Sequence, residues 1–234
     1  PVGESRQKKP SLSLTETLSK NFAVLTFDFR GHGNSTDVLP ETFWKFPANL
    51  QGNTKVNAAN AAGKNTIDIK EFSTNYYPVL VNDIAAVKCF LDRKNDTGAC
   101  NTSSTILLGA GDGATLGAIW LNAEWHRYRM VQNPVNPLLT SPDPRPEGND
   151  YIAGVWLSIN PNLGKSAVSV GKLLDISLRQ KAVPNVFLHS NEDTKGKTLA
   201  NNLIKNFKTA REKNKYPLTD RVEVKAGKLT GMEL

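Results

Sequence analysis

The chain has 234 residues, 39% of them apolar, which is long enough to bury one sizeable core within a single α/β domain. This composition excludes fibrous, collagen-like and wholly disordered proteins. No apolar run approaches the roughly 20 residues that span a bilayer. The formal charge is +7, and its excess lies between Lys165 and Lys228, where fourteen Lys and Arg accompany six Asp and Glu. This basic third is either a surface for a polyanion or a solvated face, and no nucleic-acid-binding motif accompanies it.

The first elements of the chain are a helix and a strand. Leu14 and Leu18 recur at helical spacing in a helix that ends near Lys20. Residues 22–29 are β-branched and aromatic and have no helical period, so they predict a strand that is buried on both faces.

Residues 38–75 form a long excursion that is rich in Asn, Gly, Ala and Lys. Structureless loops longer than about 15 residues are uncommon inside a compact domain and usually serve a function or move. We therefore predict a binding loop here. Trp44 and Phe46, near its start, are either anchors onto the core or aromatic contacts for a ligand.

The remaining segments alternate between helices and strands, and a loop with five prolines interrupts them at 133–150. The expected order is a helix over 79–93, a strand from Ser104, a helix to about Arg129, a strand over 152–159, a helix over 168–180, a strand over 185–189, a helix over 198–213 and a strand over 221–224. This alternation predicts one doubly wound α/β domain over 1–234, with a mostly parallel sheet covered by helices on both faces.

Ligands of such sheets bind at the carboxyl ends of the strands. In this chain that edge is expected to consist of residues 31–33, 109–114, 160–164 and 190–195.

A cluster of small residues follows the apolar run at 104–108 and opens a helix. So tight a turn needs residues without bulk, and two kinds of site use it. One is the nucleophile elbow, which holds a reactive side chain on a strained corner. The other is the dinucleotide loop G-x-G-x-x-G/A, which Gly109, Gly111 and Ala114 match. That loop also needs an acidic residue about 20 positions later, at the end of the next strand, and none is expected there.

The turn that follows residues 22–29 carries a family resemblance. Asp28, Arg30, Gly31, Gly33 and Ser35 stand at the spacing D-x-R-G-x-G-x-S, which resembles the turn after the fourth strand of many α/β-hydrolases. The resemblance implies the fold of that superfamily and a bacterial member of it. It also implies that Pro1-Val2-Gly3 is the tail of the loop that supplies an oxyanion-hole donor, so that the N-terminal strands are absent from this chain.

The resemblance implies a serine triad, whose positions can be checked one by one. Gly111 stands where the serine belongs, and a slip of one residue would place Asp112 there, as in hydrolases with an aspartate nucleophile. Asp193 matches the acid of the triad, or else it is an N-cap. No histidine follows the last strand. Of the three histidines only His32 is expected at the ligand edge, so Asp112, Asp193 and His32 are the candidate catalytic residues.

These residues predict a catalytically degenerate α/β-hydrolase-like protein, a pseudoenzyme with a binding, structural or assembly role. The alternatives are a hydrolase of esters or related bonds that uses Asp112, and a dinucleotide-binding protein. We expect no cofactor and no metal site, and other subunits of a complex as partners, through 38–75 and the basic third. The sequence leaves open a cytoplasmic or an exported location, and whether Cys89 and Cys100 form a disulfide or are two buried thiols.

Overall fold

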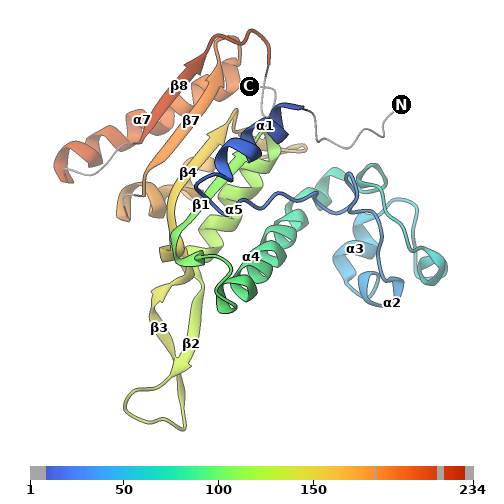
Figure 1. The fold of residues 1–234 in the computed structure, drawn as a ribbon. Coiled ribbons are helices and arrows are strands. Elements are labelled where there is room, and N and C mark those ends of the chain that lie inside the picture. Colours follow the sequence, from blue (N-terminus) through green and yellow to red (C-terminus); the bar gives the residue numbers. More distant parts are fainter. Residues whose placement is uncertain (1–8, 182, 215–218, 230–234) are drawn as a thin grey trace. The chain divides into compact units, whose positions relative to one another are not determined.

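The structure is a computed structural model that describes residues 9–181, 183–214 and 219–229 (Figure 1). The chain divides into two compact units. Unit 1 comprises 1–90 and 163–166, and unit 2 comprises 91–162 and 167–234. The single domain over 1–234 stays a prediction. No helix within the described ranges is long and apolar enough to cross a membrane. The expected oxyanion-loop tail, Pro1-Val2-Gly3, lies outside the described residues.

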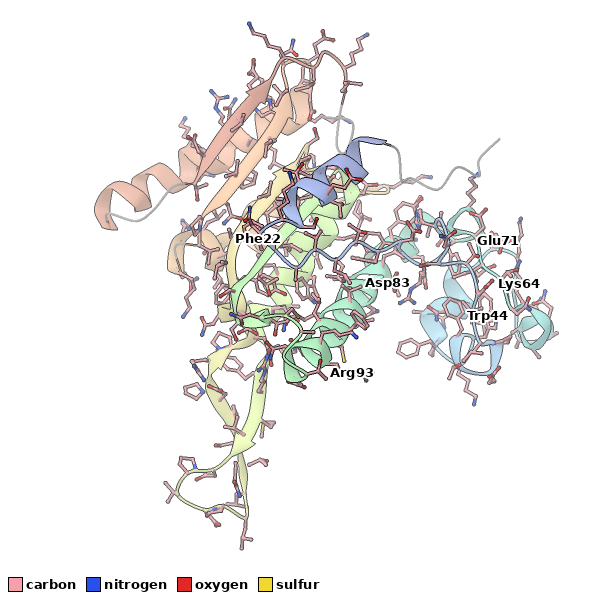
Figure 2. All side chains as sticks on the ribbon, in the orientation of Figure 1. Phe22, Trp44, Lys64, Glu71, Asp83 and Arg93 are labelled. Carbon is pink, nitrogen blue, oxygen red and sulfur yellow. The ribbon has the colours of Figure 1, made fainter. Side chains whose placement is uncertain are left out.

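Unit 1 is built of short helices, and the segment 38–75 is not the structureless loop that its composition indicated. Pro40 and Pro47 each open a helix, since the fixed φ of proline suits the first helical position. Trp44, 5% exposed, anchors this segment, and its Nε1 donates to the carbonyl of Lys64 at 2.8 Å, whereas Phe46 is 62% exposed (Figure 2). The elements are α1 (Lys9–Leu18), α2 (Pro40–Phe43), α3 (Pro47–Gly52), η1 (Ala61–Gly63), η2 (Ile69–Glu71), η3 (Thr74–Leu80) and α4 (Val81–Asp96), which continues into unit 2.

The prediction of a strand over residues 22–29 is wrong. This segment, which Phe22 opens in Figure 2, belongs to no helix or strand, and the side chains of Phe22, Val24, Leu25 and Phe27 are exposed. A strand requires ladder partners as well as β-branched and aromatic residues. No described residue of unit 1 supplies those partners to 23–29.

Unit 2 contains a parallel sheet of four strands in the order β1 (Thr105–Ala110), β4 (Tyr151–Leu157), β7 (Asn185–Ser190) and β8 (Asp220–Val224) (Figure 1). The predicted mixed α/β architecture with a parallel sheet is confirmed. The other elements of the unit are η4 (Thr102–Ser104), α5 (Asp112–His126), η5 (Glu147–Asp150), α6 (Val170–Leu173), the π-helix η6 (Ile176–Gln180) and α7 (Thr194–Asn214), with the short strands β5 (Asn162–Leu163) and β6 (Ser166–Ala167) at the boundary with unit 1.

The two faces of this sheet differ. Trp156 and Phe187, adjacent in the register, are fully buried on the face against which α5 packs. Leu108 and Val222, on the opposite face, are 37% and 45% exposed. The strands follow one another in one direction, so right-handed crossovers place their helices on one face. Helices on the second face, which a doubly wound sheet also has, stay a prediction.

The proline-rich segment 133–150 is only partly a loop. Its residues Thr140–Pro146 form β3, which pairs antiparallel with β2 (Tyr128–Gln132) in a hairpin that extends away from the four-stranded sheet (Figure 1). The helix that we expected to reach about Arg129 ends at His126, because the strand β2 begins at Tyr128. The prolines forbid a central strand, but they are tolerated on an edge strand.

Both cysteines are free, so neither sequence expectation holds. Cys89 is exposed and is therefore not a buried thiol. Cys100 is half-buried, and its Sγ lies 3.7 Å from the carbonyl oxygen of Leu91.

Candidate functional site

The carboxyl edge of the sheet in unit 2 begins at the turn between β1 and α5. Gly111 is the residue before α5 and has φ 55° and ψ −125°. A Cβ at this position would meet no atom within 4 Å, so the corner faces open space. At Gly109, by contrast, a Cβ would lie 2.6 Å from the Cα of Ala114, because the helix packs directly against the strand. The small residues thus serve two needs, a positive φ at Gly111 and close packing at Gly109.

Asp112 is the first residue of α5, and its side chain is exposed. Its Oδ1 accepts a hydrogen bond from Asn160 Nδ2 at 2.9 Å, and Thr115 Oγ1 donates to the carbonyl of Asn160 at 2.5 Å. The first turn of α5 is therefore tied to the loop that follows β4. A carboxylate at a helix N-terminus is also stabilised by the helix dipole, so this placement has a structural reason.

Ser158 extends the edge after β4. The Gly111 amide donates to the Leu157 carbonyl at 2.9 Å, and the Ser158 amide donates to the Leu188 carbonyl at 2.7 Å, so the ladder continues past the strand ends. Ser158 has φ 47°, the one positive φ among the described residues other than glycine. Its buried Oγ finds no hydrogen-bond partner among those residues. A strained backbone and an unpaired hydroxyl each cost about 1–3 kcal/mol.

His189 lies next to Ser158 in this continued ladder but does not bond to it. The ring is buried, its Nδ1 is 2.9 Å from the carbonyl oxygen of Ser190, and its Nε2 has no partner among the described residues. A general base must lie within hydrogen-bond reach of the hydroxyl it activates. No hydrogen bond joins Ser158 Oγ to His189 Nε2 among the described residues, so the structure shows no nucleophile–base pair here.

Asp193 caps helix α7. Its Oδ1 accepts from the amide of Gly196 at 2.9 Å, the third helical residue, which is the hydrogen bond of an N-cap. Its own amide donates to Ser190 Oγ at 3.0 Å. Its Oδ2 is buried and has no hydrogen-bond partner among the described residues. The N-cap role of Asp193 in a strand-to-helix loop thus accounts for one of its two carboxylate oxygens.

The loops after β7 and β8 are joined at the same edge. Ser190 Oγ donates to the carbonyl of Gly227 at 2.7 Å. Asn191 Oδ1 accepts from the amides of Ala226 and Gly227 at 3.2 and 3.0 Å. These bonds hold residues 225–229 beside the N-terminus of α7, where the family pattern would have a histidine and this chain has none.

A shallow cavity of about 370 Å³ opens beside the first turns of α7. Its lining is mainly apolar, and its one charged side chain is that of Lys195. The lining residues are Pro161, Thr194, Lys195, Thr198, Leu199 and Asn202. No carboxylate or histidine lines it, so the cavity can bind a small group but offers no pair for acid–base chemistry.

His32 belongs to unit 1, in a turn that follows an unpaired segment instead of a sheet strand. Its Nδ1 lies 3.2 Å from the carbonyl oxygen of Arg30. Gly31, with φ 75°, packs so closely that a Cβ would lie 2.6 Å from the amide nitrogen of Ile69, and Gly33 leaves room for the carboxylate of Asp28. The expected place of residues 31–33 at the carboxyl edge of a strand is therefore wrong.

Arg30 connects this turn to the rest of unit 1. Its amide and Nε donate to the two carboxylate oxygens of Asp83 at 2.9 and 2.7 Å. Its Nη1 donates to Tyr76 Oη at 3.2 Å and to Asn49 Oδ1 at 3.3 Å, and the Tyr76 hydroxyl donates to the same Asn49 oxygen at 2.6 Å. Burial lowers the pKa of Arg30, but the hydrogen bond and charge of Asp83 outweigh this effect and raise it. Arg30 is thus a structural residue of the turn.

Among the sequence candidates, unit 2 holds Gly111, Asp112 and Asp193 at one edge of the sheet, and His32 lies in unit 1. Sequence reasoning missed Ser158, since a positive φ is not expected of serine. The Asn-Pro pair at 160–161 is a turn signal and could have indicated the loop that holds Asp112. Within the described ranges, no group of three or more His, Cys, Asp or Glu side chains could hold a metal ion.

Comparison of the chain with protein-family models, with curated proteins and with solved structures found no match.

Proposed function

We propose that this protein is a non-hydrolytic binding or assembly protein with an α/β-hydrolase-like architecture, and that it lacks the serine triad. The observation that carries the proposal is the corner at Gly111. Gly111 takes a positive φ between strand and helix and faces open space, yet it has no side chain that could react. Two carboxylates of this edge have structural partners, Asn160 for Asp112 and the α7 N-terminus for Asp193.

In this proposal the carboxyl edge of the sheet binds a partner or ligand over the Gly111 corner and the cavity beside α7. The cavity supplies apolar contact and one cation, Lys195. Interfaces of this kind need shape and a few polar groups but no nucleophile. The family resemblance of the Asp28–Ser35 turn, helices on the second face of the sheet and a bacterial origin belong to the same proposal.

Asp112 supports a second candidate, a hydrolase of esters with an aspartate nucleophile, because its exposed carboxylate opens α5 at this edge. In that reaction the carboxylate oxygen would attack the acyl carbon of the ester and expel the alcohol or phenol, which leaves an acyl-aspartate anhydride, and water would then cleave this anhydride to release the acid and free Asp112. The dinucleotide alternative has less support, because residues 158–164, which follow β4, contain no acidic residue to hold a ribose.

Hydrolysis is tested with activated aryl esters on the wild type and on Asp112→Asn. We expect rates equal to the buffer background for both proteins and no adduct at Asp112 in peptide mass analysis. An acyl adduct on Asp112, or turnover that Asp112→Asn abolishes, would contradict the proposal. Added NAD or FAD should leave the melting temperature unchanged, because only a ligand of the native state raises it.

Binding is tested by quantitative capture on the immobilised wild type and two charge-reversed variants. Lys195→Glu changes the cavity, and Lys172→Glu makes the same change at an exposed residue of α6 outside the cavity lining. Partners of the proposed edge should be lost from the first variant and kept by the second. Equal capture by all three proteins would exclude this edge as the binding surface.

A further inference from the structure

The β2–β3 hairpin has two edges, and the hydrogen-bond pattern shows which residues face outward. The Asn133 amide donates to the Leu139 carbonyl near the tip, and the Glu147 amide donates to the Arg127 carbonyl at the base, both at 2.9 Å. In an antiparallel ladder such hydrogen-bonded pairs alternate with pairs whose N–H and C=O groups point outward. The outward pairs are therefore Gln132 with Thr140, Met130 with Pro142 and Tyr128 with Pro146.

Proline blocks one of these edges. Pro142, Pro144 and Pro146 of β3 have no N–H to donate to a further strand, and Thr140, opposite Gln132, is the outward residue of β3 that keeps one. The outward positions of β2 are Tyr128, Met130 and Gln132, which keep their N–H groups. This sheet has two strands, and in the described part of the chain no segment pairs with the outer edge of β2. The hairpin thus has one protected and one open edge.

The part of the hairpin beyond its base is apolar and uncharged. Residues 130–142 contain no charged side chain. At its base Arg129 donates to both carboxylate oxygens of Glu147, at 2.5 and 2.7 Å. Six large apolar side chains are nevertheless exposed, with Leu138 at 94%: Tyr128, Met130, Val131, Val135, Leu138 and Leu139. Exposed apolar groups on a projecting element mark an interaction surface.

We propose that β2 pairs antiparallel with β2 of a second copy of this chain, about a two-fold axis at Met130. The product is a four-stranded sheet in which each Tyr128 faces Gln132 of the other copy and each Arg129 faces Val131. No like charges then lie opposite each other, which favours this register. Both outer edges of the new sheet are the proline-blocked β3 strands, so the assembly closes as a dimer and does not grow into a fibre.

A second copy fits this edge for two further reasons. An uncharged surface is complementary to itself, whereas a strongly charged partner would find no opposite charge on residues 130–142. A stable interface buries about 800 Å² per partner, and the exposed apolar side chains of β2, Tyr128, Met130 and Val131, contribute to that area.

Sedimentation equilibrium of the full chain tests the proposal. The wild type should be a dimer, and Met130→Lys, which places two cations opposite each other on the axis, should raise the dimer dissociation constant about 100-fold. Met130→Pro should have a similar effect, because it removes the outward N–H. The control Leu138→Lys adds the same charge at the exposed tip and should change the constant less than about threefold. A monomeric wild type, or equal constants for Met130→Lys and Leu138→Lys, would overturn the proposal.

Cross-linking gives a second readout that does not depend on a weakened interface. With Cys89→Ser and Cys100→Ser as background, Met130→Cys should form a disulfide-linked dimer under mild oxidation, since facing residues in this register lie about 5.5 Å apart between Cα atoms. Val131→Cys, which faces Arg129 and not its own copy, should cross-link far more slowly. Equal rates for the two variants would refute the register.

Discussion

Removal of the Asp83 carboxylate is the sharpest test of how unit 1 holds together. Asp83 accepts three donors of Arg30, its amide at 2.9 Å, its Nε at 2.7 Å and its second terminal nitrogen at 2.5 Å. The side chains are 22% exposed for Arg30 and 15% for Asp83. Loss of one partner from a fully buried pair costs about 3–5 kcal/mol, and the remaining water contact reduces this to about 2–3 kcal/mol for Asp83→Asn.

Hydrogen exchange measures this loss within the unit. The amides of Ile67 and Ile69 donate to the carbonyls of Thr36 and Gly31, so they report opening of the turn and of the segment around it. In Asp83→Asn these amides should exchange about 30- to 150-fold faster, whereas those of β4 in unit 2 should keep the wild-type rate. Asp96→Asn, the same change at the exposed end of α4, should leave both sets unchanged.

A double variant separates the charge effect from simple loss of contacts. In Arg30→Met with Asp83→Leu both charges are removed, and no uncompensated ion remains in the partly buried site. Its free energy of unfolding should therefore lie closer to the wild type than that of Asp83→Asn. If the double variant is the less stable of the two, or if Asp83→Asn exchanges at the wild-type rate, the buried charge pair does not hold the turn.

Three further predictions concern unit 2. Gly109→Ala should lower the free energy of unfolding by more than about 2 kcal/mol, near the upper range for strain, because its Cβ meets the backbone of α5. Gly111→Ala should lower it by about 1–2 kcal/mol because of its positive φ. The control Gly63→Ala, whose Cβ would lie in open space, should leave urea unfolding unchanged. Burial, with a smaller effect of Glu124, raises the pKa of Tyr151. The contribution of this group to stability is therefore complete below about pH 10 and is lost at higher pH. Tyr151→Phe removes this buried hydroxyl, which has no described partner, and should abolish the pH-dependent decrease in stability when unfolding is measured from pH 8 to 11. Asp193→Ala should cost about 1 kcal/mol and Asp193→Asn much less in thermal unfolding, whereas an equal loss would argue against the N-cap.

The sheet of unit 2 was predictable because its strands and helices differ in period. The strands at 152–159, 185–189 and 221–224 were expected within a few residues, since buried parallel strands are continuous apolar runs between breakers. Residues 22–29 have the same composition and form no strand. Composition reflects the preference of a segment for an extended backbone, whereas a strand also needs hydrogen-bonding partners from other segments of the chain.

The candidate site was predictable where backbone geometry depends on residue size. The run of small residues placed the tight turn at Gly109–Ala114, and the structure has the positive φ at Gly111. Ser158 could not be predicted, because its φ of 47° results from its place between two ladders and not from its side chain. The short helices of 38–75 were missed because each is shorter than the window in which a helical period can be recognised.

The boundary between the two units falls inside α4, so unit 2 is not a portable module. A fragment that began at Leu91 would keep only residues 91–96 of this helix, which are too few to form a stable helix by themselves. In such a fragment the amides of 91–96 should exchange with solvent faster than in the full chain. For fusion proteins and truncations, the unit of design is therefore the whole chain.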